Sequence, residues 1–246
     1  MKPTHGFFSF TEVTDPAEHH SYNEWHQLDH LPEQFPLPGI AYGQRWVSTP
    51  ACRAARVVSA AELDPIHYVT CYLMAGPIEQ MIDEFFALGA ELHRLDRFHR
   101  HRRAHLTGPF RIDGSEAAPR VLVSAAAVPF RAHRGIYVMV EELLDVDAAD
   151  GERPGLFAVA GVAGVWTFAS APGLTSKRWT PGARRITACW IDDDVLETAT
   201  RIGPVVSDWQ AHCAPRARVT FAGPFESITP WKWDWFDRSA IDETEG

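Results

Sequence analysis

One segment, residues 19–39, gathers the side chains best suited to chemistry in this chain of 246 residues. On a helix, Tyr22, His26 and His30 are spaced four residues apart, so they share one face. A helix that packs against a core normally places Leu, Ile or Val on such a stripe. A phenol and two imidazoles in their place predict one wall of a ligand pocket.

The two imidazoles predict acid–base catalysis. Because an imidazole titrates near neutral pH, His30 can take a proton from a phenol or from a carbon beside a carbonyl group. Asp29 or Glu33 can orient an imidazole, and Asp29 suits His26 better than His30 because adjacent helix residues do not face each other. The predicted catalytic residues are therefore His30, His26 and Asp29.

Four residues are predicted to bind the substrate: Tyr22, Trp25, Arg45 and Tyr68. The two phenols and the guanidinium can stabilise an oxyanion or an enolate. Trp25 lies on the helix stripe beside Tyr22. The partner that suits this set is a small apolar or aromatic molecule that carries a carbonyl or phenol group.

Neither a metal nor a cofactor is predicted. His26 and His30 have the spacing of a zinc-binding HExxH pair, but Gln27 stands where that motif has its glutamate, and the third ligand would have to come from elsewhere. Haem ligation by His93 or His99 stays an alternative. The sequence has no GxGxxG or phosphate-binding loop and no specific Ser-His-Asp grouping.

Composition excludes several classes of function. A formal net charge of −9 argues against binding to a nucleic-acid backbone. No apolar run approaches the roughly 20 residues that cross a bilayer, so we expect no membrane span. The N-terminal residues lack the apolar core of a signal peptide, and the four cysteines show no CxxC spacing, so we expect a cytoplasmic protein.

A basic run between His93 and His105 is the exception to this acidic composition. We interpret the run as the end of a helix followed by a solvated loop, because cations suit a helix C-terminus. The alternative is a site for an anionic substrate or partner.

Four segments recur in the same order in the two halves of the chain, and they predict a tandem duplication. The matched pairs are 37–50 with 159–172, 70–73 with 188–191, 108–110 with 223–225 and, more loosely, 6–13 with 135–142. The predicted organisation is a first repeat with the active pocket at 1–112, a linker with a bridging strand around 120–128 at 113–134, and a second, degenerate repeat at 135–246.

The first repeat has the pattern of a ferredoxin-like βαββαβ unit, an antiparallel sheet with both helices on one face. Its predicted elements are strands at 7–13, 39–48 and 67–73, helices at 15–31 and 78–95, and a last strand in a segment that ends with residues 108–112. Asp15 followed by Pro16 predicts the start of the first helix, and Pro32 its end. A second sheet is the natural cover for the free sheet face.

The second repeat departs from this pattern. The segment 150–155 predicts a short or irregular first helix, and Pro204 predicts a kink or early break in the second. The aromatic segment 231–236 is expected to pack on the body as an extended arm. A ligand-facing aromatic cluster is the alternative.

The sequence also resembles a known superfamily. The residues that carry this resemblance are Tyr22-Asn23-x-Trp25-x4-His30-Leu31-Pro32, Leu37-Pro38-Gly39-Ile40 and Gly43-x-Arg45-Trp46. They look like the dimeric α+β barrel superfamily, and most like its EthD-like and antibiotic-biosynthesis-monooxygenase branches. The resemblance implies an α+β fold in which two ferredoxin-like units pack sheet to sheet, usually in a homodimer and here within one chain. It leaves open a further homodimer.

The resemblance also implies pockets between each sheet and its helices, with His30 in the wall of one. The chain departs from the relatives at His26, where they often have Tyr. We therefore expect a cofactor-independent acid–base enzyme of the lyase, isomerase or cyclase type, with His30 as general acid or base. The alternatives are a cofactor-free monooxygenase of aromatic or polyketide-like substrates, and a non-catalytic protein that binds a small ligand or haem.

Overall fold

The computed structural model describes residues 2–145, 154–171, 174, 183–214 and 216–237. Nine strands form one sheet in the order β2-β4-β1-β5-β7-β8-β6-β9-β3, and all neighbours are antiparallel. The strands are β1 (His5–Val13), β2 (Ile40–Val47), β3 (Val58–Ser59), β4 (Tyr68–Met74), β5 (Arg102–Ala117), β6 (Gly135–Leu143), β7 (Val162–Ser170), β8 (Arg184–Ile191) and β9 (Ala217–Ser227). The predicted α+β class is confirmed.

The sheet closes on itself because β9 also pairs with β2. The first half of the sheet has the order β2-β4-β1-β5, and the second half has the order β7-β8-β6-β9. The two halves meet where β5 pairs with β7 and where β2 pairs with β9. Among the described strands only the short strand β3 lies at an edge, so few backbone groups of these strands lack a partner strand.

Apolar side chains fill the inside of the closed sheet. All eight long strands contribute to one cluster, which includes Phe8, Phe10, Trp46, Leu73, Phe110, Val138, Phe168, Trp190 and Phe225. Because side chains alternate between the faces of a strand, the residues between them point outward. The inside is therefore a packed core, and any ligand site must lie on the outer face.

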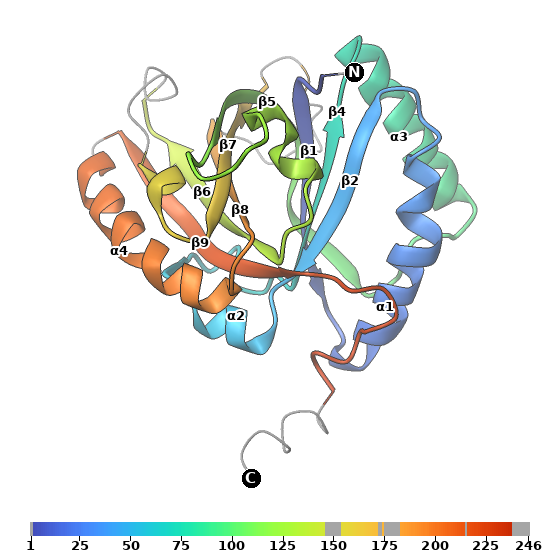
Figure 1. Cartoon of the computed structure of the whole chain (residues 1–246). Coiled ribbons are helices and arrows are strands. Elements are labelled where there is room, and N and C mark those ends of the chain that lie inside the picture. The colour runs from blue at the N-terminus through green and yellow to red at the C-terminus, as the bar shows by residue number, and fades with distance from the viewer. Residues whose placement is uncertain (1, 146–153, 172–173, 175–182, 215, 238–246) are drawn as a thin grey trace.

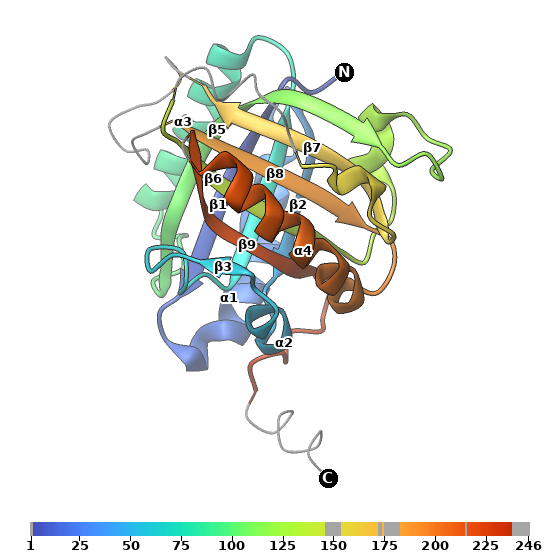
Figure 2. The ribbon, with the colours of Figure 1, turned by 90° about the vertical axis from the view of Figure 1, so that its left-hand side faces the viewer.

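Helices cover the outer face of each half. Helices α1 (His19–Trp25) and α3 (Ile78–Arg94) lie over the first half, and α4 (Val195–Cys213) lies over the second (Figures 1 and 2). The short helix α2 (Pro50–Ala54) connects β2 to β3. None of the described helices is both long enough and apolar enough to cross a membrane.

The first helical segment is not one regular helix. It opens with a 3-10 turn that the side chain of Asp15 caps by accepting from the backbone N–H of Ala17, as the sequence predicts. After α1 comes a π-helical turn at His26–His30, in which the N–H of Leu31 donates to the carbonyl of His26 at 2.8 Å. A 3-10 turn at Pro32–Gln34 follows.

One prediction for the connections is wrong. No strand forms at 120–128; β5 itself extends to Ala117 to pair with β7, and a 3-10 helix occupies Ala125–Phe130. Of the kink or early break expected at Pro204, the break does not occur, because α4 continues through Pro204 to Cys213. Residues 146–153, where the second half was expected to have an irregular first helix, lie outside the described residues.

The C-terminal aromatic segment packs on the first half, as an arm without regular strand structure. It follows β9 and passes beside α1 (Figure 1). The indole N–H of Trp233 donates to Oε1 of Gln27 at 3.0 Å, and the ring of Phe236 stacks on His19 with centroids 3.9 Å apart. The arm therefore stabilises the outer side of the helix whose inner side carries the predicted site.

Candidate functional site

A cavity of about 1100 Å³ lies on the outer face of the first half of the sheet, beneath α1 and α3. Alternate residues of β1 and β4 form its floor: Phe7, Ser9, Thr11, Thr70 and Tyr72. The opposite wall comes from the first helical segment, from α3, and from the chain between α3 and β5. We call this space the first-half cavity.

The structure brings three of the predicted residues to this cavity. Tyr22, His26 and His30 all line it. The π-helical turn adds one residue to the helical repeat, and the rings of His26 and His30 lie with their centroids 5.2 Å apart. Such turns occur often at functional sites, because they redirect side chains within a helix. The two imidazoles are therefore held as a pair.

His30 is held as a neutral imidazole. Its ring stacks on Trp25 with centroids 4.7 Å apart and contacts the ring of Phe98. Burial, and next the charge of Arg102, lower the pKa of His30 to about 4. Its buried Nδ1 has no hydrogen-bond partner among the described residues. At neutral pH the ring is therefore uncharged and can accept a proton, and its stacking on Trp25, which does not line the cavity, fixes its orientation.

His26 is more deeply enclosed. Only 4% of it is exposed, and its Nε2 lies 3.5 Å from the hydroxyl of Thr70. Burial, and next the charge of Arg45, hold its pKa well below the usual range. Its Nδ1 is also without a partner in the described part of the chain. His26 and His30 together give the cavity wall two neutral imidazoles.

Asp29 does not orient an imidazole by a hydrogen bond. Its carboxylate pairs with Arg97 at 2.7 Å, and Glu33 pairs with the same guanidinium at 2.7 Å. The indole N–H of Trp25 donates to the backbone carbonyl of Arg97, also at 2.7 Å. These three contacts fasten the chain after α3 to the first helical segment, so Asp29 positions the cavity wall.

Arg45 and Tyr68 lie behind the wall rather than in it. The guanidinium of Arg45 lies 5.6 Å from the ring centroid of Tyr22 and 5.5 Å from that of Tyr68, and it donates to Oδ1 of Asn23. The hydroxyl of Tyr68 accepts from Nδ2 of Asn23 at 2.8 Å and lies 2.9 Å from Nδ1 of His19. These residues support Tyr22 from beneath and do not line the cavity.

The structure adds Tyr72, which the sequence analysis did not predict. Its hydroxyl is buried without a hydrogen-bond partner among the described residues, and it lines the cavity. Burial raises the pKa of this phenol, so it stays protonated and can donate to an oxyanion. The alternation of Tyr68, Thr70 and Tyr72 along one face of a strand was the available signal.

Several arginines of the basic run pair with carboxylates, but the run is not only a helix end and a loop, because residues 102–105 begin β5 and His93, His99, Arg100 and Arg102 line the cavity. Arg94 pairs with Glu91, Arg100 with Asp96, and Arg103 with Glu12. Arg102 differs. It lines the cavity, and its guanidinium lies 5.3 Å from the ring centroid of Phe98.

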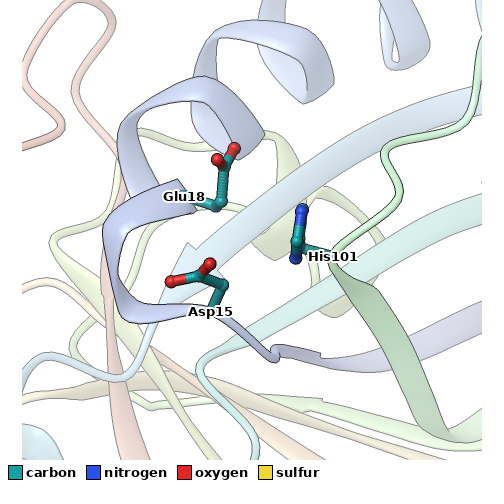
Figure 3. Close-up of side chains that lie close together, drawn as sticks. All are labelled: Asp15, Glu18 and His101. Carbon is teal, nitrogen blue, oxygen red and sulfur yellow. The ribbon is translucent and has the colours of Figure 1, made fainter.

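A second group of polar side chains surrounds the start of the first helical segment (Figure 3). Potential ligand atoms of Asp15, Glu18 and His101 lie within 4.8 Å of one another. Both carboxylates have structural roles: Asp15 caps the helical turn, and Oε2 of Glu18 accepts from the hydroxyl of Ser21 at 2.5 Å. Asp15 and Glu18 therefore both have hydrogen-bond partners within the helical segment itself.

Comparison with known proteins supports the fold. No protein-family model and no curated protein match the sequence. Among solved structures, the one described as "Crystal structure of Putative Chlorite dismutase TA0507" superposes with a TM-score of 0.52 and 9% identity, over 95% of this chain and 98% of that one. A second, described as a "putative monooxygenase from Lactobacillus acidophilus NCFM", gives a TM-score of 0.41 and 8% identity, over 93% and 94%. The first likeness shows a shared fold.

Proposed function

We propose that the protein is a cofactor-independent acid–base enzyme in which His30 takes a proton from a small, largely apolar substrate. The observation that carries this proposal is the unpartnered, buried Nδ1 of a neutral imidazole in the wall of a large cavity. A base must be unprotonated at the working pH and must reach the proton that it removes. The lowered pKa of His30 keeps its ring unprotonated at neutral pH. Its position in the cavity wall lets a substrate approach the ring.

The neighbouring residues fit the same step. When a phenol or a carbon beside a carbonyl loses its proton to His30, negative charge develops on an oxygen of the substrate. The neutral hydroxyl of Tyr72 is a preformed donor for that oxygen. The imidazolium of His30 and the new anion then attract each other, which offsets the low basicity of the free imidazole. Phe7 and Phe85, with ring centroids 4.7 Å apart, offer an apolar surface for the body of the substrate.

The experiment begins with mass spectrometry of the small molecules that co-purify with the protein. With the identified substrate, His30→Ala is expected to lower kcat/KM by about 10²- to 10⁴-fold, the usual contribution of a general base. His20→Ala is the matched control, because His20 is exposed on the same helix and does not line the cavity. Unchanged turnover in His30→Ala would show that the proton goes elsewhere.

A cofactor-free monooxygenase is the second candidate, because it begins with the same deprotonation. An electron-rich carbanion or phenolate formed in the apolar part of the cavity is the species that reacts directly with O₂. Oxygen uptake in proportion to substrate consumed distinguishes this reaction from an isomerisation, a lyase reaction or a cyclisation. A Soret band in the purified protein would instead support the haem-binding alternative.

We also propose that the two halves arose by duplication of one unit, residues 1–112 and 135–246, joined by 113–134. The repeated strand order supports this origin. So does a register shift at the same place in each half, between Phe10 and Thr11 where β1 pairs with β5 and between Val140 and Glu141 where β6 pairs with β9. Phe10 and Val140 both face the inner core, so these positions correspond.

A further inference from the structure

The first-half cavity faces a positive charge that no carboxylate of the described residues neutralises. Of the two arginines in its lining, Arg100 pairs with Asp96 at 2.8 Å. Asp96 is the one carboxylate among the lining residues, and it is engaged in this pair. Arg102 is half-buried and forms no ion pair with any described side chain. The ring of Phe98 contacts both Arg102 and His30, which places this charge close to the catalytic imidazole.

A second uncompensated charge lies just behind the wall. Arg45 is 2% exposed, and its hydrogen-bond partner, Asn23, is neutral. Its Nε and Nη1 have no partner in the described residues. Burial of an unpaired charge is costly unless a counter-charge lies nearby. The second half also buries an arginine, Arg185, but there the carboxylate of Glu141 pairs with it at 2.7 Å.

The two guanidiniums act on the same side chains. Both lower the pKa of His26 and of His30, so both lie close enough to produce a positive potential at this wall of the cavity. Tyr72 adds a buried hydroxyl that can donate. Phe7, Phe85 and Phe86, whose rings contact one another, add an aromatic surface to the lining. The cavity therefore combines a cationic end with an aromatic surface.

We propose that the first-half cavity binds an organic monocarboxylate with an aromatic or alicyclic body, and that Arg102 pairs with its carboxylate. This inference rests on the proposed function and names the substrate class for it. The aromatic surface takes the body of the ligand, Arg102 fixes one end, and the reacting proton faces His30. A planar guanidinium suits this role because it can hold a carboxylate through two parallel hydrogen bonds.

The test compares two probes of nearly equal shape, 2-naphthoate and its neutral amide, 2-naphthamide, by titration calorimetry with the full chain. Wild-type protein is expected to bind the carboxylate about ten- to a hundredfold more tightly than the amide, the usual contribution of a charge-assisted hydrogen bond. Arg102→Gln is expected to abolish this preference, and Arg102→Lys to retain part of it. Arg103→Gln is the matched control, because Arg103 is the next residue and is exposed.

Equal binding of the two probes by the wild type, or no binding of either, would overturn the inference, as would a preference that survives Arg102→Gln. Near-UV circular dichroism checks that each variant folds. If Arg102→Gln does not fold, two other measurements replace it. A smaller carboxylate preference in Arg102→Lys, and a wild-type preference that falls as the salt concentration rises, would support the inference, and an unchanged preference in both would overturn it. His30→Ala separates this inference from the proposed function. Turnover without His30 would refute proton transfer by this residue, whereas the carboxylate preference is tested by Arg102→Gln and does not require His30.

Discussion

The two halves of the protein share one sheet order, but the space between the sheet and its helices is filled in one half and partly open in the other. In the second half, α4 packs directly on the sheet (Figure 2), and Tyr137, Met139, Ile202 and Val206 belong to one buried cluster there. In the first half, Met81, Ile82 and Phe85 of α3 also pack on the sheet, but part of the space beneath α1 and α3 is a cavity of about 1100 Å³ with polar residues on its floor. A shared fold therefore leaves the site to be decided by a few outward-facing side chains.

The two halves also differ in how they neutralise buried charges. The register shifts make Glu141 the counterpart of Thr11, and their partners across the neighbouring strand are Arg185 and Tyr68. Glu141 also accepts a hydrogen bond from the indole N–H of Trp209 at 2.8 Å. The second half thus satisfies its buried charge with its own residues. The first half has no carboxylate at that position, and a ligand can supply one.

Removing the internal counter-charge is the strongest test of this contrast. Glu141→Gln leaves the guanidinium of Arg185 buried without a charge partner and is expected to lower the free energy of unfolding by about 3–5 kcal/mol. Urea denaturation of the variant and the wild type measures the change. Glu142→Gln is the control; it breaks the exposed pair with Arg218 and is expected to cost less than about 1 kcal/mol. Equal effects would mean that the buried pair does not stabilise the second half.

Acid is expected to destabilise the first half through its neutral histidines. The pKa of His30 lies at about 4 in the folded protein and near 6.5 in the unfolded chain. The unfolded chain therefore binds more protons below pH 6.5, so this contribution to stability is complete above pH 6.5 and is lost as the pH falls towards 4. His30 alone accounts for about 2 kcal/mol between pH 7 and pH 5.

His30→Gln removes this titration, so the variant is expected to lose about 2 kcal/mol less stability than the wild type over that interval. Urea denaturation at the two pH values measures the difference, with His20→Gln as the control on the exposed side of the same helix. Identical pH dependence in His30→Gln and the wild type would contradict a depressed pKa for His30, and with it the neutral base on which the proposed function depends.

The sequence predicted the class of fold and the shared face of Tyr22, His26 and His30, because both follow from local spacing. The π-helical turn that pairs the two imidazoles was not predictable from that spacing. Tyr72 and Arg102 come from other strands, and only the tertiary structure brings them to the cavity. Helical periodicity predicts the residues that one helix contributes to a site, but not the residues that other elements contribute.

The repeat alignment shows a second limit. It matched Cys71 with Cys189, but Cys71 faces the inner core and Cys189 faces α4. A shift of one residue in a strand reverses the direction of every side chain, so this match joins positions that are not equivalent. Phe110 and Phe225, by contrast, both face the inner core, so their match is consistent with the direction of the side chains. Identity of residue type is thus a weaker guide to register than the face on which a side chain lies.

The smallest predicted effect compares one glycine in each covering helix. A methyl group at Gly89 of α3 would meet no atom within 4 Å, and one at Gly203 of α4 would lie 3.5 Å from the side chain of Val57, an ordinary contact. Gly89→Ala and Gly203→Ala are each expected to stabilise the fold by about 0.5–1 kcal/mol, because alanine loses less conformational freedom in a helix. Thermal and urea denaturation measure both. Since Gly89 lines the cavity and Gly203 does not, weaker binding of 2-naphthoate in Gly89→Ala alone would show that the ligand extends along α3. Equal binding in the two variants would place the ligand nearer Arg102 and the first helical segment.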